Sequence, residues 1–442
     1  MMKMTPVAVA FAIIFLVRRN RLWQRTHRKF KRSSSRWKRC KSKWLRCKTG
    51  WKQWLQRRNR RRKTAASDFP LTTQIGGANV SLYGFVDLSA DVGNDGKQGV
   101  KQVSSNLSYV GVRGSKDLGS TGMKAIFQVE TLANISGTPT ETGALASRNS
   151  FVGLEGGFGK LMLGKTDTPY KRATAMMDPF ASSVGDYNTI MGNTGGDLRA
   201  EFDARLPHAI FYDSPKLRGF FCQCAFFRRA RNSITWQTPT NMLLLKVKKI
   251  CAGATPGSSG SLPDPGSTLC NDGAFKKNAY SLALNYESGP LLGTVSYERH
   301  QLVDRTSDNG GNTADESAAK VGVSYNFGSN RLSGIYEKFY RNGGIDPTVN
   351  ERARTGYYLS DVQELGHGMD LMGAWAHAST TPGGPDFGTV NDKANMYALG
   401  LKYHYDKQLA LYLVGAVLKQ GAGAHYALGT GGAWHCDCVA SQ

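Results

Sequence analysis

The sequence predicts an all-β protein whose antiparallel strands cross a membrane as a closed barrel. Apolar and polar residues alternate through many segments, aromatic residues recur at the ends of the apolar faces, and short turns alternate with long polar loops. A tilted membrane strand of about ten residues has this pattern, with apolar residues toward lipid and polar residues toward water. A soluble sandwich, propeller or solenoid would also alternate, so the alternation alone leaves those folds open.

The period of two is clearest in residues 80–89 and 397–403. Valine, leucine and glycine occupy the even positions from 80 to 88, while Asp87 and Ser89 occupy odd positions. In the second segment, tyrosine and leucine occupy the odd positions, and alanine, glycine and lysine occupy the even ones. Successive strand residues point to opposite faces, so each segment predicts one apolar and one polar face.

The stretch "NLSYVGVRGSKDLGSTGMKAIFQVE" raises the question of which environment surrounds such a sheet. It carries charge, glycine and aromatic residues where a soluble strand would carry a compact apolar face. We expect Phe127 and Val129 to face lipid and Lys124 and Glu130 to face a wet interior. A closed barrel also satisfies every backbone hydrogen bond within hydrocarbon.

The positive charge of the chain is confined to its beginning. Residues 1–63 contain 23 of the 57 Lys and Arg and no acidic residue, which leaves 34 basic against 33 acidic residues in 64–442. A basic leader with five tryptophans could be a nucleic-acid arm. The nearly neutral remainder gives no reason to expect a nucleic-acid partner for the protein as a whole.

These patterns divide the chain into five segments. Residues 1–17 form a partial signal-peptide-like segment with an apolar run, 18–63 form an anomalous basic leader, and 64–78 form a linker. Residues 79–430 form the barrel, interrupted by an anomalous segment at 221–250, and residues 431–442 form an anomalous tail. The segment at 221–250 shows no strand alternation.

Three motifs resemble general porins of Gram-negative bacteria, especially those of β-proteobacteria. They are "SLYGFVDLSADVG", "VGVRGSKDLGSTGMKAIFQVE" and "RNSFVGLEGGFGKLMLGKTDTPY", which together cover much of 79–170. The resemblance implies a homotrimer of barrels of about sixteen strands, in contact with outer-membrane lipid and lipopolysaccharide. Each barrel would pass small hydrophilic solutes and ions by passive diffusion, with no enzymatic activity, cofactor or metal.

The resemblance also implies that the third loop folds inward, so that acidic groups on the loop face basic groups on the wall. Opposed charges across a narrow aqueous gap bias ion passage by sign. The candidate acidic residues of this loop are Asp167, Asp178, Asp186 and Asp197. The candidate basic residues of the wall are Arg113, Lys124, Arg148, Lys165 and Lys320. The preferred ion sign is left open.

Three segments depart from the porin pattern: 18–63, 221–250 and the tail "LGTGGAWHCDCVASQ", which ends in Gln442 where the family has a terminal aromatic residue. Seven of the eight tryptophans and six of the eight cysteines lie in them. We interpret the segments as products of out-of-frame translation. On this interpretation, a non-functional copy of a porin is an alternative to a working channel. The alternative is real divergence into a cationic arm, an insertion and a redox-active tail.

Other chemistry has weak support in the sequence. Cys251 and Cys270 bracket a Gly/Pro/Ser-rich loop and could form a disulfide or remain free thiols. "HCDC" lacks a second pair of metal ligands, and "GLEGGFGK" lacks the spacing and the Ser or Thr of a phosphate loop. An outer-membrane barrel hydrolase stays open as an alternative, because one sequence cannot show whether His, Ser and an acid meet at a rim.

Overall fold

The computed structural model describes residues 7–17, 71–94, 99–136, 145–192, 202–227, 278–303, 314–342, 353–380, 391–421, 424 and 426–429. These residues contain eighteen strands in one sheet. The strands are β1 (Val7–Val17), β2 (Leu71–Ile75), β3 (Ala78–Asn94), β4 (Gly99–Ser105), β5 (Tyr109–Asp117), β6 (Lys124–Leu132), β7 (Ser150–Gly156), β8 (Gly159–Asp167), β9 (Arg205–Asp213), β10 (Phe220–Phe227), β11 (Ala279–Ser288), β12 (Leu291–Val303), β13 (Ala314–Phe327), β14 (Asn330–Asn342), β15 (Thr355–Gly366), β16 (Met369–Ala378), β17 (Ala394–His404) and β18 (Leu409–Gln420).

The connections contain one short α-helix, α2 (Pro169–Thr174), and two 3-10 turns, η1 (Gly119–Thr121) and η2 (Tyr187–Thr189). In the described part of the chain, no helix has the length and apolarity required to cross a membrane.

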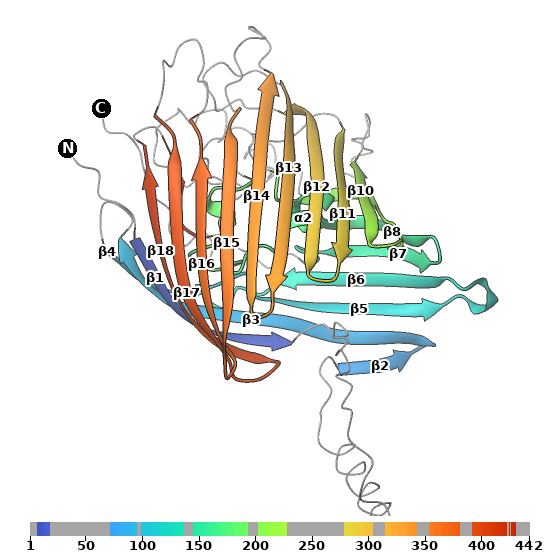
Figure 1. The fold of residues 1–442 in the computed structure, drawn as a ribbon. Helices are drawn as coiled ribbons and strands as arrows, with labels where there is room; N and C mark the ends of the chain where they lie inside the picture. Colours follow the sequence, from blue (N-terminus) through green and yellow to red (C-terminus); the bar gives the residue numbers. More distant parts are fainter. Residues whose placement is uncertain are drawn as a thin grey trace, which may run out of the picture.

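The sheet closes on itself as a barrel. From β5 to β18 each strand pairs with the next, β3 pairs with β5, and β1 pairs with both β18 and β3. The register of β2 and of β4 runs along β3 alone, so the closed circuit of described strands contains sixteen strands. Figure 1 shows this curved wall, with α2 on its concave side behind β12 and β13. The predicted barrel of about sixteen strands is confirmed.

The first hairpin of the barrel is set by its turn. β2 and β3 are joined by Gly76 and Gly77, whose φ angles are +57° and +75°. A two-residue hairpin turn of type I′ requires positive φ at both central residues, which glycine adopts without steric cost. The turn therefore fixes the register from Ile75–Ala78 to Leu71–Leu82.

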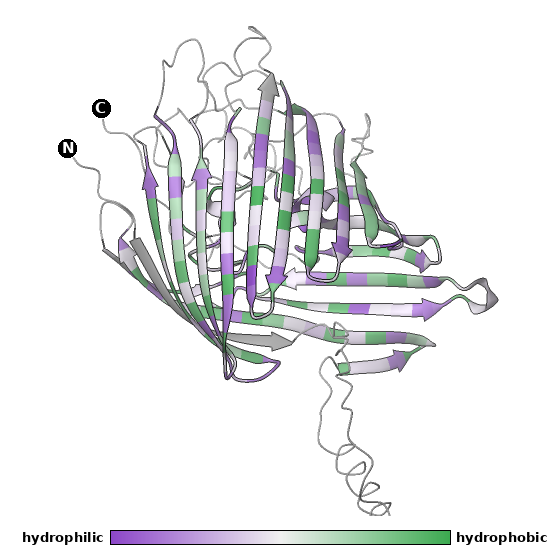
Figure 2. Ribbon diagram, in the orientation of Figure 1, coloured by the Kyte–Doolittle hydropathy of each residue, from purple (hydrophilic) through white to green (hydrophobic). Residues whose placement is uncertain are grey.

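The two faces of the wall have opposite character. Leu399 and Val295 are 64% and 56% exposed, while Asp87 and Lys320 on the inner face are almost fully buried. Figure 2 shows the alternation of apolar and polar positions along β11–β18. An apolar outer face toward lipid and a polar inner face are the arrangement of a membrane barrel. The predicted faces of 80–89 and 397–403 are confirmed, and Val129 and Glu130 lie on the expected sides.

Three segments differ from the expected division of the chain. The expectation that 221–250 lacks a strand is wrong at its beginning, because β10 spans Phe220–Phe227 and pairs with both β9 and β11. Neighbouring strands supply partners on both edges, and this pairing overrides weak alternation. The expected linker 64–78 contains β2, and the signal-peptide-like segment contains β1. The ranges 18–63, 228–250 and 431–442 lie outside the described residues.

Candidate functional site

The connection between β8 and β9 folds into the barrel and is here called the inward loop (168–204). It starts with α2, whose first turn is set by the sequence Thr-Pro: the Thr168 hydroxyl accepts a hydrogen bond from the Lys171 amide, and Pro169 occupies the first helical position. A hydroxyl N-cap followed by proline is a strong helix start. α2 packs on β11 and β12, and the Tyr170 amide donates to the Ser281 hydroxyl at 3.0 Å.

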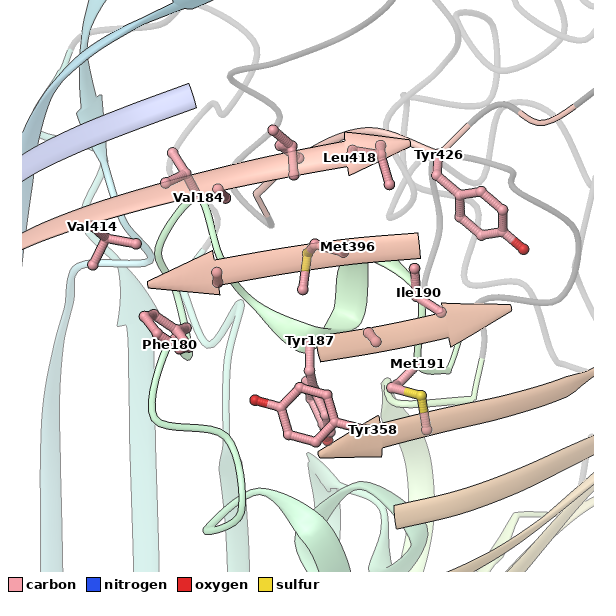
Figure 3. Packing of buried hydrophobic residues seen from close by; sticks show 14 of the residues in the cluster. Phe180, Val184, Tyr187, Ile190, Met191, Tyr358, Met396, Val414, Leu418 and Tyr426 are labelled. Atoms are coloured by element: carbon pink, nitrogen blue, oxygen red, sulfur yellow. The ribbon is translucent and has the colours of Figure 1, made fainter. Parts of the chain in front are cut away.

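An apolar cluster holds the middle of the loop against β15–β18. Figure 3 shows Phe180, Tyr187, Ile190 and Met191 of the loop packed on side chains of these strands. The wall residues of this cluster include six small ones on β16–β18: Ala376, Ala378, Ala394, Ala398, Ala410 and Ala416. Small inner-face residues leave the space that the loop side chains fill at close-packed density.

Glycines on the inner face allow still closer approach. A Cβ atom placed on Gly400 would lie 2.8 Å from Cε1 of Phe180, and one on Gly322 would lie 2.8 Å from Sδ of Met177. Real Cβ contacts are essentially never shorter than 3.0 Å. The wall is therefore shaped to accept the loop at these two positions.

A buried ionic network fixes the other side of the loop to β13 and β14. The Lys320 ammonium on β13 lies 2.6 Å from Asp203 of the loop and 3.7 Å from Glu337 on β14, and all three side chains are fully buried. The ammonium also donates to the Thr174 hydroxyl at 3.1 Å and lies 4.0 Å from the centre of the Tyr170 ring. A buried charge needs such partners, because desolvation is costly.

The two carboxylates of this network bind further loop groups. Glu337 accepts hydrogen bonds from the Tyr170 hydroxyl at 2.6 Å and from the Gly192 amide at 2.9 Å. Asp203 accepts from the Tyr187 hydroxyl at 2.5 Å and from the Asn188 side-chain amide at 3.0 Å. The start, middle and end of the loop thus meet at one point on the wall.

Asp178 and Asp186, two of the expected pore acids, are buried within the loop. Asp178 accepts hydrogen bonds from the amides of Phe180 and Tyr187 and from the Tyr358 hydroxyl on β15. Burial raises the pKa of Asp178 to about 8, with the Asp186 charge adding to the rise and these donors opposing it. Burial likewise raises the pKa of Asp186 to about 6. Both carboxyls shape the loop and do not face open water.

The opposite wall, formed by β3–β9, carries arginines stacked on tyrosines. The Arg113 guanidinium on β5 lies 4.8 Å from the ring centre of Tyr83, and the Arg148 guanidinium lies 4.6 Å from that of Tyr109. The two rings meet edge to face at 6.2 Å. Glu130 connects the pairs, because it binds Arg148 at 2.8 Å and accepts from the Tyr83 hydroxyl at 3.0 Å. Stacking holds both guanidinium groups in place, and Arg148 is held in addition by its charge-assisted hydrogen bond to Glu130.

A third arginine extends this row at the start of β9. Arg205 lies 3.4 Å from Asp167 and donates to the Asn149 side-chain oxygen at 3.0 Å. Lys171 of α2 lies 3.4 Å from the same Asp167 carboxylate, and Arg172 forms a bidentate pair with Asp213 at 2.8 Å. We call Arg113, Arg148 and Arg205 the arginine row.

The loop and the arginine row lie on different parts of the barrel wall. The apolar and buried ionic contacts of the loop are with β11–β18, whereas Lys171 and Arg172 of α2 pair with carboxylates on β8 and β9. The row lies on β5, β9 and the entry to β7. This arrangement leaves the arginine row free of the apolar packing that covers the other wall. It is the geometry of a channel narrowed from one side.

The other predicted residues are distributed as follows. Lys124 is exposed at the first position of β6 beside η1, 3.7 Å from Asp117. Lys165 pairs in register with Ser150 on β7 and lies where the register of β8 with β9 shifts, between Gly164 and Thr166. Lys320 lies on the wall, but its ammonium is sealed beneath the loop. Asp197 and the pair Cys251 and Cys270 lie outside the described residues.

The sequence reasoning missed Asp203 and Arg205. Both occur in "EFDAR", where the inward loop returns to a strand, and their alternation with apolar residues was the available signal. It also missed Glu130 as a partner of Arg148, because the two are joined only by the pairing of strands. Within the described residues, no group of three His, Cys, Asp or Glu side chains could hold a metal ion.

Comparisons with known proteins agree with this geometry. The model of the family described as Gram-negative porin matches residues 64–423. The chain is 27% identical over 347 residues to the major outer membrane protein P.IA of Neisseria meningitidis serogroup C, covering 73% of this chain and 79% of that protein. It is 24% identical over 344 residues to the outer membrane porin protein 32 of Delftia acidovorans, covering 76% and 82%.

Solved structures show the same fold. An anion-selective porin from Comamonas acidovorans superposes with a TM-score of 0.54 at 19% identity, covering 78% of this chain and 99% of that one. The OmpF of Salmonella typhi, solved with daunomycin, superposes with a TM-score of 0.51 at 12% identity, covering 79% and 100%. The sequence match spans most of the barrel, and the barrel contains the inward loop that the motifs predicted. The chain therefore belongs to the Gram-negative porin family, whose members are outer-membrane channels for the passive diffusion of small hydrophilic solutes and ions.

Proposed function

We propose that this porin favours small anions, and that the arginine row sets this preference. The proposal rests on the burial of three acidic residues of the inward loop. Asp178, Asp186 and Asp203 are all buried in contacts that hold the loop. Of the three expected loop acids that lie in the described residues, Asp178 and Asp186 are therefore withdrawn from the lumen, and Asp167 is paired with Lys171 and Arg205. Basic groups remain on the opposite side.

The local balance of charge supports the same sign. Arg148 is paired with one carboxylate, Glu130. Arg205 and Lys171 share the single carboxylate of Asp167, so the two bases exceed the acid by one positive charge. In the described part of the chain, Arg113 contacts the Tyr83 ring and forms no ion pair with a carboxylate. A narrow aqueous gap with excess positive charge raises the local concentration of anions.

The size of the effect follows from Coulomb's law. A unit charge about 6 Å from a permeating ion contributes about 0.7 kcal/mol in water, favourable for an anion and unfavourable for a cation, which is about a tenfold effect on the ratio of anion to cation permeability. The similar fold of an anion-selective porin from Comamonas acidovorans supports the proposal. Family membership further supports a homotrimer surrounded by lipid and lipopolysaccharide, with the apolar outer face in contact with lipid.

The test is the reversal potential of single substitutions in a planar bilayer with a salt gradient. Arg113→Gln should lower the ratio of anion to cation permeability about tenfold. Lys124→Gln is the matched control, because it removes the same charge from an exposed residue at the strand end. If Arg113→Gln leaves the reversal potential where it was, the arginine row does not set the preference.

A further inference from the structure

Two cysteines lie next to each other on the outer face of β10. Cys222 and Cys224 occupy alternate positions of the strand, so their side chains project from the same face as Phe226, which is 37% exposed. Both are free cysteines and half-buried, and the Cys224 thiol is hydrogen-bonded to Cys222. They lie in the part of the chain that departs from the porin pattern, and the proposed channel makes no use of them.

An apolar groove on the wall runs beside these thiols. It has a volume of about 250 Å³ and is lined by side chains of β9, β10 and β11, including Cys224. The two hydroxyls of its lining are engaged elsewhere. The Tyr212 hydroxyl donates to the Phe158 carbonyl at 2.8 Å, and the Tyr280 hydroxyl accepts from the Asn278 side chain at 3.1 Å. The residues that line the groove include no carboxylate or imidazole, so a ligand in it would meet carbon and sulfur.

The strand geometry opposes a disulfide between the two thiols. Residues two apart in a strand have Cβ atoms about 6.6 Å apart, whereas a disulfide needs about 3.5–4.5 Å. A disulfide would require β10 to bend, and its pairing with both β9 and β11 resists bending. A bridging metal has a longer reach, since two metal–thiolate bonds of about 2.3 Å span about 4.6 Å between the sulfur atoms. The pair is therefore spaced for a metal bridge.

The thiols lie close to the membrane surface, at the turn between β9 and β10. Cys222 is the third residue of β10. Lys216 of the turn forms an exposed ion pair with Glu287 at 2.9 Å. On the turn side of the thiols, the rings of Phe220 and Tyr286 pack with their centres 4.5 Å apart. Exposed charges mark water and aromatic residues mark the membrane interface, so a metal ion can reach the thiols from the aqueous side.

We propose that Cys222 and Cys224 form a binding site for a soft, two-coordinate metal cation, with the mercuric ion as its best-matched ligand. Thiolates select soft metals, and two ligands are too few for a structural zinc site, which takes four. One mercuric ion replaces the two thiol protons, which gives a neutral dithiolate and releases two protons to water without any transfer of electrons. A neutral complex suits the apolar groove, because a net charge there is costly to desolvate. A monovalent ion such as Cu⁺ would leave a net negative charge.

The test is a titration of the folded full-length protein with mercuric chloride, in a variant whose other six cysteines are changed to serine. We expect one mercuric ion per chain, loss of both thiols to alkylation in the same step, and two protons released per metal ion. The matched control adds Gln223→Cys and Cys224→Ser, which keeps two thiols but places them on opposite faces of the strand. Stripping the metal from the native pair should take about tenfold more glutathione, or more, than stripping it from the control.

Two mercuric ions per chain, equal stripping from both variants, or a disulfide between Cys222 and Cys224 in mass spectra of the unmodified protein would overturn the proposal. If the control does not fold, Cys224→Ser alone takes its place, because it too removes the second thiolate. The site lies on the outer face, so the mercuric ion should leave the reversal potential of the channel unchanged. A shifted potential would place the thiols in the lumen and would also overturn the proposal. None of these outcomes depends on whether Arg113 sets the anion preference.

Discussion

The buried ammonium of Lys320 gives the sharpest test of how the inward loop is held. Lys320→Met keeps most of the side-chain volume and removes the charge that lies 2.6 Å from Asp203 and 3.7 Å from Glu337. All three side chains are fully buried. The substitution therefore leaves two carboxylates in the interior without their cation.

The expected cost follows from this burial. Removing one partner of a buried ion pair costs about 3–5 kcal/mol, because the remaining charge is desolvated and uncompensated. The hydrogen bond from Lys320 to Thr174 and the contact with the Tyr170 ring are lost as well. We expect Lys320→Met to lower the free energy of unfolding by about 3–5 kcal/mol. We also expect a larger and noisier conductance, since the loop is released from the wall.

The assay combines denaturant unfolding in detergent with single-channel recording. The double variant Lys320→Met with Asp203→Asn should lose less stability than Lys320→Met alone, because the nearer stranded carboxylate is gone. If Lys320→Met unfolds within about 0.5 kcal/mol of the parent and its conductance is unchanged, the network does not hold the loop.

Two further predictions concern the same loop. Burial raises the pKa of Asp178 from its ordinary value of 3.8 to about 8, so the folded loop binds a proton that the unfolded chain releases. The contribution of this proton to stability is full below pH 4 and is lost as the pH rises to about 8. Asp178→Asn should therefore flatten the dependence of the free energy of unfolding on pH over this range. An unchanged slope would show that other groups cause this dependence. Gly400→Val should clash with Phe180, lower the free energy of unfolding by about 1–3 kcal/mol and raise the conductance. Gly373→Val is the control, because a Cβ atom there meets open space, and it should lower the free energy of unfolding only slightly. Equal effects of the two substitutions in urea unfolding would contradict the close approach of Phe180 to Gly400.

Much of the barrel could be predicted because its signal is local. Leu399 and Leu401 are two residues apart and share the outer face, so the sequence alone shows their side. β10 could not be predicted in this way, since Phe220–Phe227 is a strand through its pairing with β9 and β11. β1 was missed for the same reason, because its apolar run has no alternation and its partners lie more than 60 residues away in the chain.

The site was predicted less well, because charge in a sequence does not show exposure. Asp178 and Asp186 were expected to face the pore, and both are buried by contacts within the loop. Lys320 was expected on the wall and lies there, but its role depends on Asp203, 117 residues earlier. Arg113 and Arg148 were identified by their position in strand motifs, whereas Arg205 needed the folded loop to bring it to Asp167.

The reversal potential of the unmodified protein in a planar bilayer, measured across a tenfold gradient of potassium chloride, tests the central claim most directly. An anion-favouring channel with the arginine row in its wall should give a potential of the sign set by chloride. The preference should weaken as salt is raised, because screening shortens the reach of the fixed charges. A potential of the sign set by potassium would contradict the account.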